Sequence, residues 1–173
     1  MPGDTLIRWT ARLFVACYVA RLCIDAAGRR DESAQRAARW WWTVGCGIFV
    51  LHVAAAFHFQ HGWSHATAFE HVRQRTLLDT GWDSGIGLYL NHAFGLLWLA
   101  DTILWWRRLD RSEQRPTYWI VQSLLAFMML QATAVFGPPL WRPVCAAVVV
   151  TLIALRVTHH HPIHGSYTPR GHE

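Results

Sequence analysis

Long apolar segments constrain this chain more than any other feature of its sequence. Four of them, residues 40–59, 86–106, 117–136 and 140–157, are nearly free of charge. Each is close to the roughly 20 residues of helix that cross the hydrocarbon core of a bilayer. Only Gly137, Pro138 and Pro139 separate the last two segments. Because these residues end one helix and begin another, the sequence predicts a tight helical hairpin there.

A fifth apolar segment, residues 9–27, is interrupted by charged residues. On a helix, Arg8 and Arg12 would lie on one side and Arg21 and Asp25 on the other, so no single polar face of a surface helix exists. We therefore expect a spanning helix in which Arg21 and Asp25, four residues apart, form an ion pair. An interfacial helix is the alternative, and it would leave four spans.

The predicted fold is all-α, a multi-pass membrane bundle of five transmembrane helices. It forms one domain, residues 1–158, followed by a histidine-rich tail, residues 159–173. Hydrophobic residues make up 53% of the chain and charged residues only 16%, which is too little charge for an ordinary soluble surface. This composition excludes a disordered chain and a nucleic-acid-binding arm.

The distribution of arginine predicts the topology. The connections at residues 28–39 and 107–116 hold four arginines each, whereas the longer connection at residues 60–85 holds only Arg73 and Arg75. By the positive-inside rule, the two arginine-rich connections and the C-terminal tail are cytoplasmic, and loop 60–85 is extracytoplasmic. We expect the cytoplasmic membrane of a bacterium.

The outer loop contains one further predicted helix. Thr67 and Glu70 match the T-x-x-E capping box, and apolar residues then recur at helical spacing as far as Leu78. The pattern predicts a short amphipathic helix over residues 67–78, lying on the outer face.

Six of the eleven histidines lie between His52 and His92. His58, His61 and His65 follow the pattern HxxHxxxH, which on one continuous helix places the three imidazoles within about 60° of one face. Three imidazoles on one face can share a metal ion. Gly62 and Ser64 mark the places where such a helix would break instead.

Depth in the membrane suggests a second arrangement. His52 and His92 both lie roughly 10 Å below the outer interface if their segments are antiparallel neighbours. They would then face each other, as paired histidines do when they ligate haem from two helices.

We therefore predict a metal site near the extracytoplasmic face. Its ligands are drawn from His52, His58, His61, His65 and His92. Residues that would orient these ligands or transfer protons are Glu70, His71, Asp79, Asp83 and Asn91. Imidazole suits copper, zinc, iron or haem b, whereas magnesium or calcium would want more carboxylates. Asp101 lies deeper and is expected to join Arg21 and Asp25 in structural ion pairing.

The leading function is metal or haem binding in redox chemistry or electron transfer. One alternative is a non-enzymatic structural or assembly subunit of a membrane complex, and another is a metal or proton transporter. A transporter needs a polar path to the inner side, but residues 93–100 supply only apolar side chains. The sequence leaves open whether the chain is an enzyme. Its expected partners are the lipid bilayer and other membrane subunits or a second copy, and no nucleic acid.

Overall fold

The computed structural model describes residues 2–28, 31–107, 116–135 and 137–160, so most of the predicted histidine-rich tail lies outside the described residues. Within these ranges every regular element is helical, which confirms the all-α prediction for this part of the chain. The elements are α1 (Pro2–Ala26), α2 (Glu32–Phe59), α3 (His65–Thr80), α4 (Gly87–Trp106), α5 (Pro116–Leu130), the π-helical turn η1 (Gln131–Val135) and α6 (Trp141–His160).

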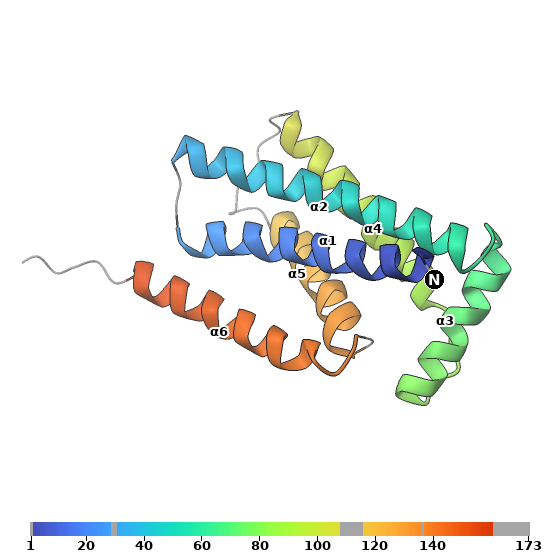
Figure 1. The fold of residues 1–173 in the computed structure, drawn as a ribbon. Coiled ribbons are helices and arrows are strands. Elements are labelled where there is room, and N and C mark those ends of the chain that lie inside the picture. The colour runs from blue at the N-terminus through green and yellow to red at the C-terminus, as the bar shows by residue number, and fades with distance from the viewer. Residues whose placement is uncertain (1, 29–30, 108–115, 136, 161–173) are drawn as a thin grey trace, which may run out of the picture.

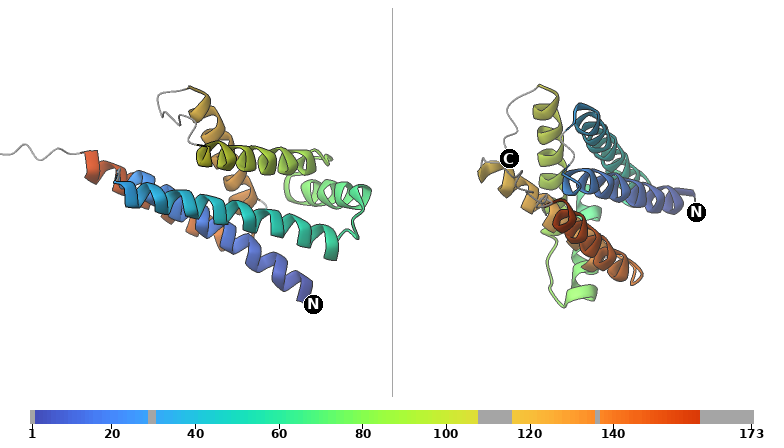
Figure 2. Two further views of the ribbon diagram at one scale, coloured as in Figure 1. Left: turned by 90° about the horizontal axis from the view of Figure 1, so that it is seen from above. Right: turned by 90° about the vertical axis from the view of Figure 1, so that its left-hand side faces the viewer.

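The helices form an elongated bundle. Figure 1 shows α1 and α2 as an antiparallel hairpin that stays in contact along most of its length, with α4 packed against α2. α6 runs beside α1, and α5 crosses the direction of these helices (Figure 1, Figure 2). α3 lies across one end of the bundle, where it contacts α4.

The bundle therefore has two distinct ends. The start of α1, the end of α2 and the start of α4 lie beside α3, and we call this the α3 end (Figure 1). The turn between α1 and α2 lies at the opposite end, as does the end of α4, where the rings of Trp40 and Trp106 are 5.3 Å apart. We call this the arginine end, because Arg39 lies there over the rings of Trp105 and Trp106.

Aromatic rings from three helices form the core. Trp42 on α2 and Trp98 on α4 are fully buried, and their ring centroids lie 5.0 Å apart. Phe14, Phe49 and Phe94 surround Trp98 at 5.4–6.4 Å. Such offset and edge-to-face contacts add to the free energy of apolar burial. The core thereby fixes α1, α2 and α4 between the two ends.

Two helices are long and apolar enough to cross a membrane in the part of the chain that the structure describes. They are α2 and the Trp141–Thr158 portion of α6, while Gln122–Val135 is a shorter apolar stretch. α1 carries five charged residues and α4 carries Asn91, His92 and Asp101, which reduce the apolar character of these helices. The structure thus supports two candidate spans, and five spans remain a proposal.

The predicted hairpin between the last two apolar segments is present. η1 ends at Val135 and α6 begins at Trp141, whose backbone N–H donates to the Pro138 carbonyl oxygen at 2.9 Å. Across the turn, the Cys145 thiol donates to the Thr133 hydroxyl at 3.2 Å. Two prolines that cannot donate backbone hydrogen bonds therefore stop the helix and reverse the chain.

The helix predicted over residues 67–78 is longer than expected, and its N-cap is different. α3 spans residues 65–80 because Ser64, not Thr67, is the N-cap, and its hydroxyl oxygen accepts from the Thr67 N–H at 3.2 Å. α3 ends at Gly81, whose φ of 77° is left-handed and favours glycine. The predicted capping box was therefore wrong, since Glu70 binds Arg73 instead.

Candidate functional site

A sharp turn between α2 and α3 separates the three histidines of the HxxHxxxH pattern. Gly62 and Trp63 have φ values of 54° and 61°, and the Ser64 N–H donates to the His61 carbonyl oxygen at 2.9 Å. His61 consequently lies in the turn, whereas His58 belongs to α2 and His65 begins α3. The arrangement expected from one continuous helix, with all three on one face, is thus not the one adopted.

His58 lies at the surface, apart from the other histidines of the pattern. Its Nδ1 accepts a hydrogen bond from the indole Nε1 of Trp63 at 3.2 Å, and its ring packs edge-on against Phe59. This nitrogen already has a partner, so the bond to Trp63 would have to break before it could bind a metal ion.

Among the histidine rings that the structure describes, His61 and His71 form the closest pair. Their ring centroids lie 5.2 Å apart with an angle of 75° between the ring planes. His61 is only 9% exposed, and its Nδ1 is buried without a hydrogen-bond partner among the described residues. Burial lowers the pKa of His61, and the neighbouring His71 lowers it further. The environment therefore favours neutral imidazole, the form that binds metals.

A second pair joins α3 to α4. The rings of His65 and His92 are nearly parallel, at 18°, with centroids 5.9 Å apart, and Tyr89 lies 5.5 Å from His65. The ring of Phe57 lies 5.7 Å from His61 and 5.9 Å from His92, so it contacts both pairs. We call His61, His65, His71 and His92 the outer histidine cluster.

His52 lies outside this cluster. Its Nδ1 is 3.1 Å from the Ile7 carbonyl oxygen, to which it donates in the Nδ1–H tautomer, and 3.2 Å from the Thr10 hydroxyl of α1. Its ring packs edge-on against Phe14 at 5.4 Å. The structure therefore gives His52 and His92 different neighbours and does not bring them together as the expected facing pair. The cause is α1, which begins at Pro2 and covers the face of α2 that carries His52.

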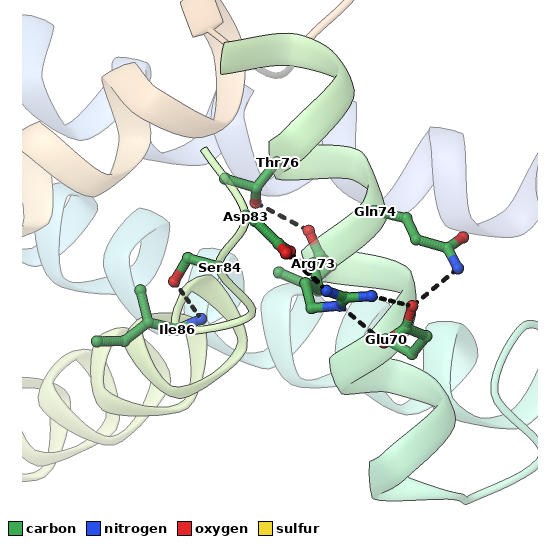
Figure 3. Close-up of polar contacts among 8 residues, drawn as sticks. Glu70, Arg73, Gln74, Thr76, Asp83, Ser84 and Ile86 are labelled. Carbon is green, nitrogen blue, oxygen red and sulfur yellow. Dashed lines mark hydrogen bonds and ion pairs between the residues drawn. The ribbon is translucent and has the colours of Figure 1, made fainter. Parts of the chain in front are cut away.

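The carboxylates of Glu70, Asp79 and Asp83 bind arginines rather than imidazoles. Figure 3 shows Arg73 between Glu70 and Asp83. The guanidinium donates to Glu70 at 2.9 and 3.1 Å and to Asp83 at 2.7 and 2.8 Å. These hydrogen bonds hold the pKa of Glu70 below its usual range. Asp79 binds Arg75 at 2.7 Å. The three carboxylates thus contribute to the structure of the α3 end, where Arg73 ties α3 to the turn before α4.

A groove of about 380 Å³ lies beside this ion pair. It is lined by Phe69, Arg73, Asp83, Ser84, Gly85, Ile86 and Tyr89. None of these residues is a histidine, although Tyr89 also contacts His65. Asn91, which was expected near the ligands, is exposed on α4.

The buried charge at the arginine end has a different environment. Arg21 is 2% exposed and lies 2.8 Å from the Asp25 carboxylate, so the structure places the expected pair in contact. Arg21 also donates to the Gln122 side-chain oxygen at 2.9 Å and lies 4.7 Å from the ring centroid of Trp42. Gln122 was not among the predicted site residues, although an amide side chain within an apolar segment was a usable signal.

Asp101 lies partly buried on α4, near the same end. One turn further along, the ring of Trp105 has the guanidinium groups of both Arg21 and Arg39 within 5.9 Å of its centroid. Aromatic faces thus surround the arginines of this end, a favourable arrangement for a cation away from water.

The histidines of the α3 end are arranged in pairs. Among the described residues no group of three or more His, Cys, Asp or Glu side chains is placed to hold a metal ion. Comparisons with protein-family models, with curated proteins and with solved structures found no match to this chain.

Proposed function

We propose that the chain is an integral membrane protein that binds a transition-metal ion at its extracytoplasmic end and uses it in redox chemistry or electron transfer. The observation that carries this proposal is the outer histidine cluster. It brings four imidazoles from the α2–α3 turn, α3 and α4 to one end of the bundle, in two adjacent pairs. Neutral imidazole is a ligand for copper, zinc and iron.

Exposed apolar side chains support the membrane part of the proposal. No residue of α6 from 141 to 158 is buried, and Val150 and Ile153 are 66% and 58% exposed. On α4, Leu96 is 69% exposed. A water-soluble monomer rarely presents so many large apolar residues together. We take α1, α2, α4, α5 with η1, and α6 as five spans, with the arginine end in the cytoplasm.

The orientation can be tested by thiol labelling. The four native cysteines are replaced by alanine, and Thr80→Cys then places one exposed thiol at the end of α3. We expect a membrane-impermeant maleimide to label this thiol from outside in intact cells. If the thiol is labelled only after the cells are permeabilised, the proposed orientation of the α3 end is wrong.

The metal site can be tested by metal analysis of protein purified in detergent. We expect the wild-type chain to retain copper, zinc or iron after gel filtration. The variant with His61, His65, His71 and His92 all changed to glutamine should lose it. His52→Gln is the matched control, because His52 bonds to α1 and lies outside the cluster. Equal metal content in the wild type and the fourfold variant would contradict the proposal.

A second candidate function is that of a non-enzymatic subunit of a membrane complex. The observation that favours it is the packing of α6. Among the described elements, α6 has its main contacts with α1 and η1, and the rest of its surface is uncovered. A partner helix could cover that surface as readily as lipid does. Recovery of a stable complex that holds no metal would favour this function over the first.

A further inference from the structure

We infer that His61 and His71 are the two protein ligands of a copper ion whose remaining coordination positions are open. This inference rests on the proposed function, because it specifies which part of the outer histidine cluster binds the metal and which metal it binds.

The two histidine pairs of the cluster differ in whether a buried ring nitrogen lacks a hydrogen-bond partner. His61 is 9% exposed, and its buried Nδ1 lacks a hydrogen-bond partner within the described ranges. A buried nitrogen without a partner costs free energy, which a bond to a metal ion recovers. His71 is exposed on α3, so one ring of the pair contacts water. No nitrogen of His65 or His92 is buried in this unsatisfied way among the described residues.

The distance between the rings suits a bent metal site. A nitrogen–metal bond of about 2.0 Å places a metal ion about 3.2 Å from the centre of each imidazole ring. The observed centroid separation of 5.2 Å then corresponds to an angle of about 110° at the metal. The two imidazoles would thus occupy neighbouring positions around the metal, whereas a linear arrangement would require the rings to move roughly 1 Å further apart.

Protein side chains fill only two positions of such a site. No third His, Cys, Asp or Glu joins the pair in the part of the chain that the structure describes. The carboxylates of Glu70 and Asp83 are held by Arg73. The remaining positions are therefore available to water or to a small anion.

The donor set favours copper over zinc. Nitrogen sites bind Cu²⁺ more tightly than Zn²⁺ in the order of the divalent first-row metals. A structural zinc site normally has four protein ligands and a catalytic zinc site three, which this pair does not supply. Copper also supplies the one-electron couple that the proposed redox function needs.

The first test measures copper binding to the full chain in detergent. We expect one Cu²⁺ per chain, with an electron paramagnetic resonance spectrum that shows nitrogen coupling. His61→Gln and His71→Gln should each weaken binding by more than about tenfold. His71 is exposed, so its substitution tests the site even if the buried His61→Gln variant does not fold. His58→Gln, at the edge of the same turn, is the control and should bind as the wild type does.

The second test probes the open positions. Azide added to the copper-loaded protein should bind the metal directly and produce a new charge-transfer absorption band. An unchanged spectrum would mean that the coordination is closed and would overturn this part of the inference.

The outcomes separate this inference from the proposed function. If His65→Gln and His92→Gln abolish copper binding while His61→Gln and His71→Gln do not, the inference is wrong and the proposed metal-binding function stands. If the protein retains zinc and has no affinity for copper, the inference is likewise wrong and the proposed metal-binding function stands. If no metal binds to the wild-type chain, both are wrong.

Discussion

Arg21 and His61 are both almost completely buried, 2% and 9% exposed, but their neighbours differ in kind. Arg21, at the arginine end, lies against a carboxylate, an amide oxygen and an aromatic face. His61, at the α3 end, has another imidazole as its nearest titratable neighbour. A cation among such groups is stabilised without any ligand. The His61–His71 pair has no opposite charges, so it lacks the ion-pair stabilisation that Arg21 has.

The aromatic core around Trp98 lies between these two ends, and the two ends differ in how closely they pack against it. The arginine end is packed around Trp42, which belongs to that core. The α3 end extends beyond it, on a helix that has only one fully buried residue, Ala68. We therefore expect substitutions near the core to change stability, and substitutions in the cluster to change metal binding with little effect on stability.

The largest effect is expected for Trp98→Ala. Removing a fully buried indole leaves a cavity in the core, and the expected loss is about 3–5 kcal/mol in the free energy of unfolding. The control is Trp82→Ala in the turn between α3 and α4, where the side chain is 75% exposed and the expected change is within about 0.5 kcal/mol. Unfolding in detergent micelles, followed by near-ultraviolet circular dichroism, measures both. Similar losses for the two variants would show that the α3 end is as tightly packed as the core.

The next effect concerns the ion pair. Asp25→Leu leaves the Arg21 guanidinium buried without its carboxylate, and we expect a loss of about 2 kcal/mol, less than for a fully buried pair because Asp25 is 31% exposed. The double variant Arg21→Leu/Asp25→Leu should lose less, because the buried guanidinium is removed together with this carboxylate.

The corresponding change at the α3 end is Asp79→Leu, which breaks the more exposed Arg75–Asp79 pair and should leave the unfolding midpoint nearly unchanged. If the single Asp25 variant and the double variant are equally stable, the carboxylate does not compensate the charge of Arg21.

The parts of this fold that the sequence predicts are those set by local geometry. The apolar segment at residues 86–106 corresponds to α4 within one residue, because helix length follows from the run of apolar residues. The contact between Arg21 and Asp25 follows from their spacing of four residues on one helix.

The histidine cluster depends on contacts that residue counting does not provide. Counting gives the depth of His52 and His92, but the rotation of each helix and the position of α1 decide what each ring contacts. His61 meets His71 only because the chain reverses through left-handed conformations at Gly62 and Trp63. Gly62 and Ser64 marked the break between the helices in the sequence, but a left-handed non-glycine residue is uncommon, so nothing at Trp63 indicated how the chain would turn.

The smallest effect is expected at two helical glycines that differ in their surroundings. A Cβ at Gly95 on α4 would lie 2.9 Å from Cε1 of the buried Phe49, whereas a Cβ at Gly47 on α2 would meet nothing within 4 Å. Gly47→Ala should therefore stabilise the protein by up to about 1 kcal/mol, through the higher helix propensity of alanine. Gly95→Ala should lose about 1 kcal/mol, because Phe49 has to move within a packed core. Gly95 also lies less than one turn from His92, so copper binding by the same variant shows whether strain in the core reaches the α3 end. We expect unchanged binding, because His61 and His71 are held by the turn and by α3; weakened binding would mean that core and cluster act as one unit.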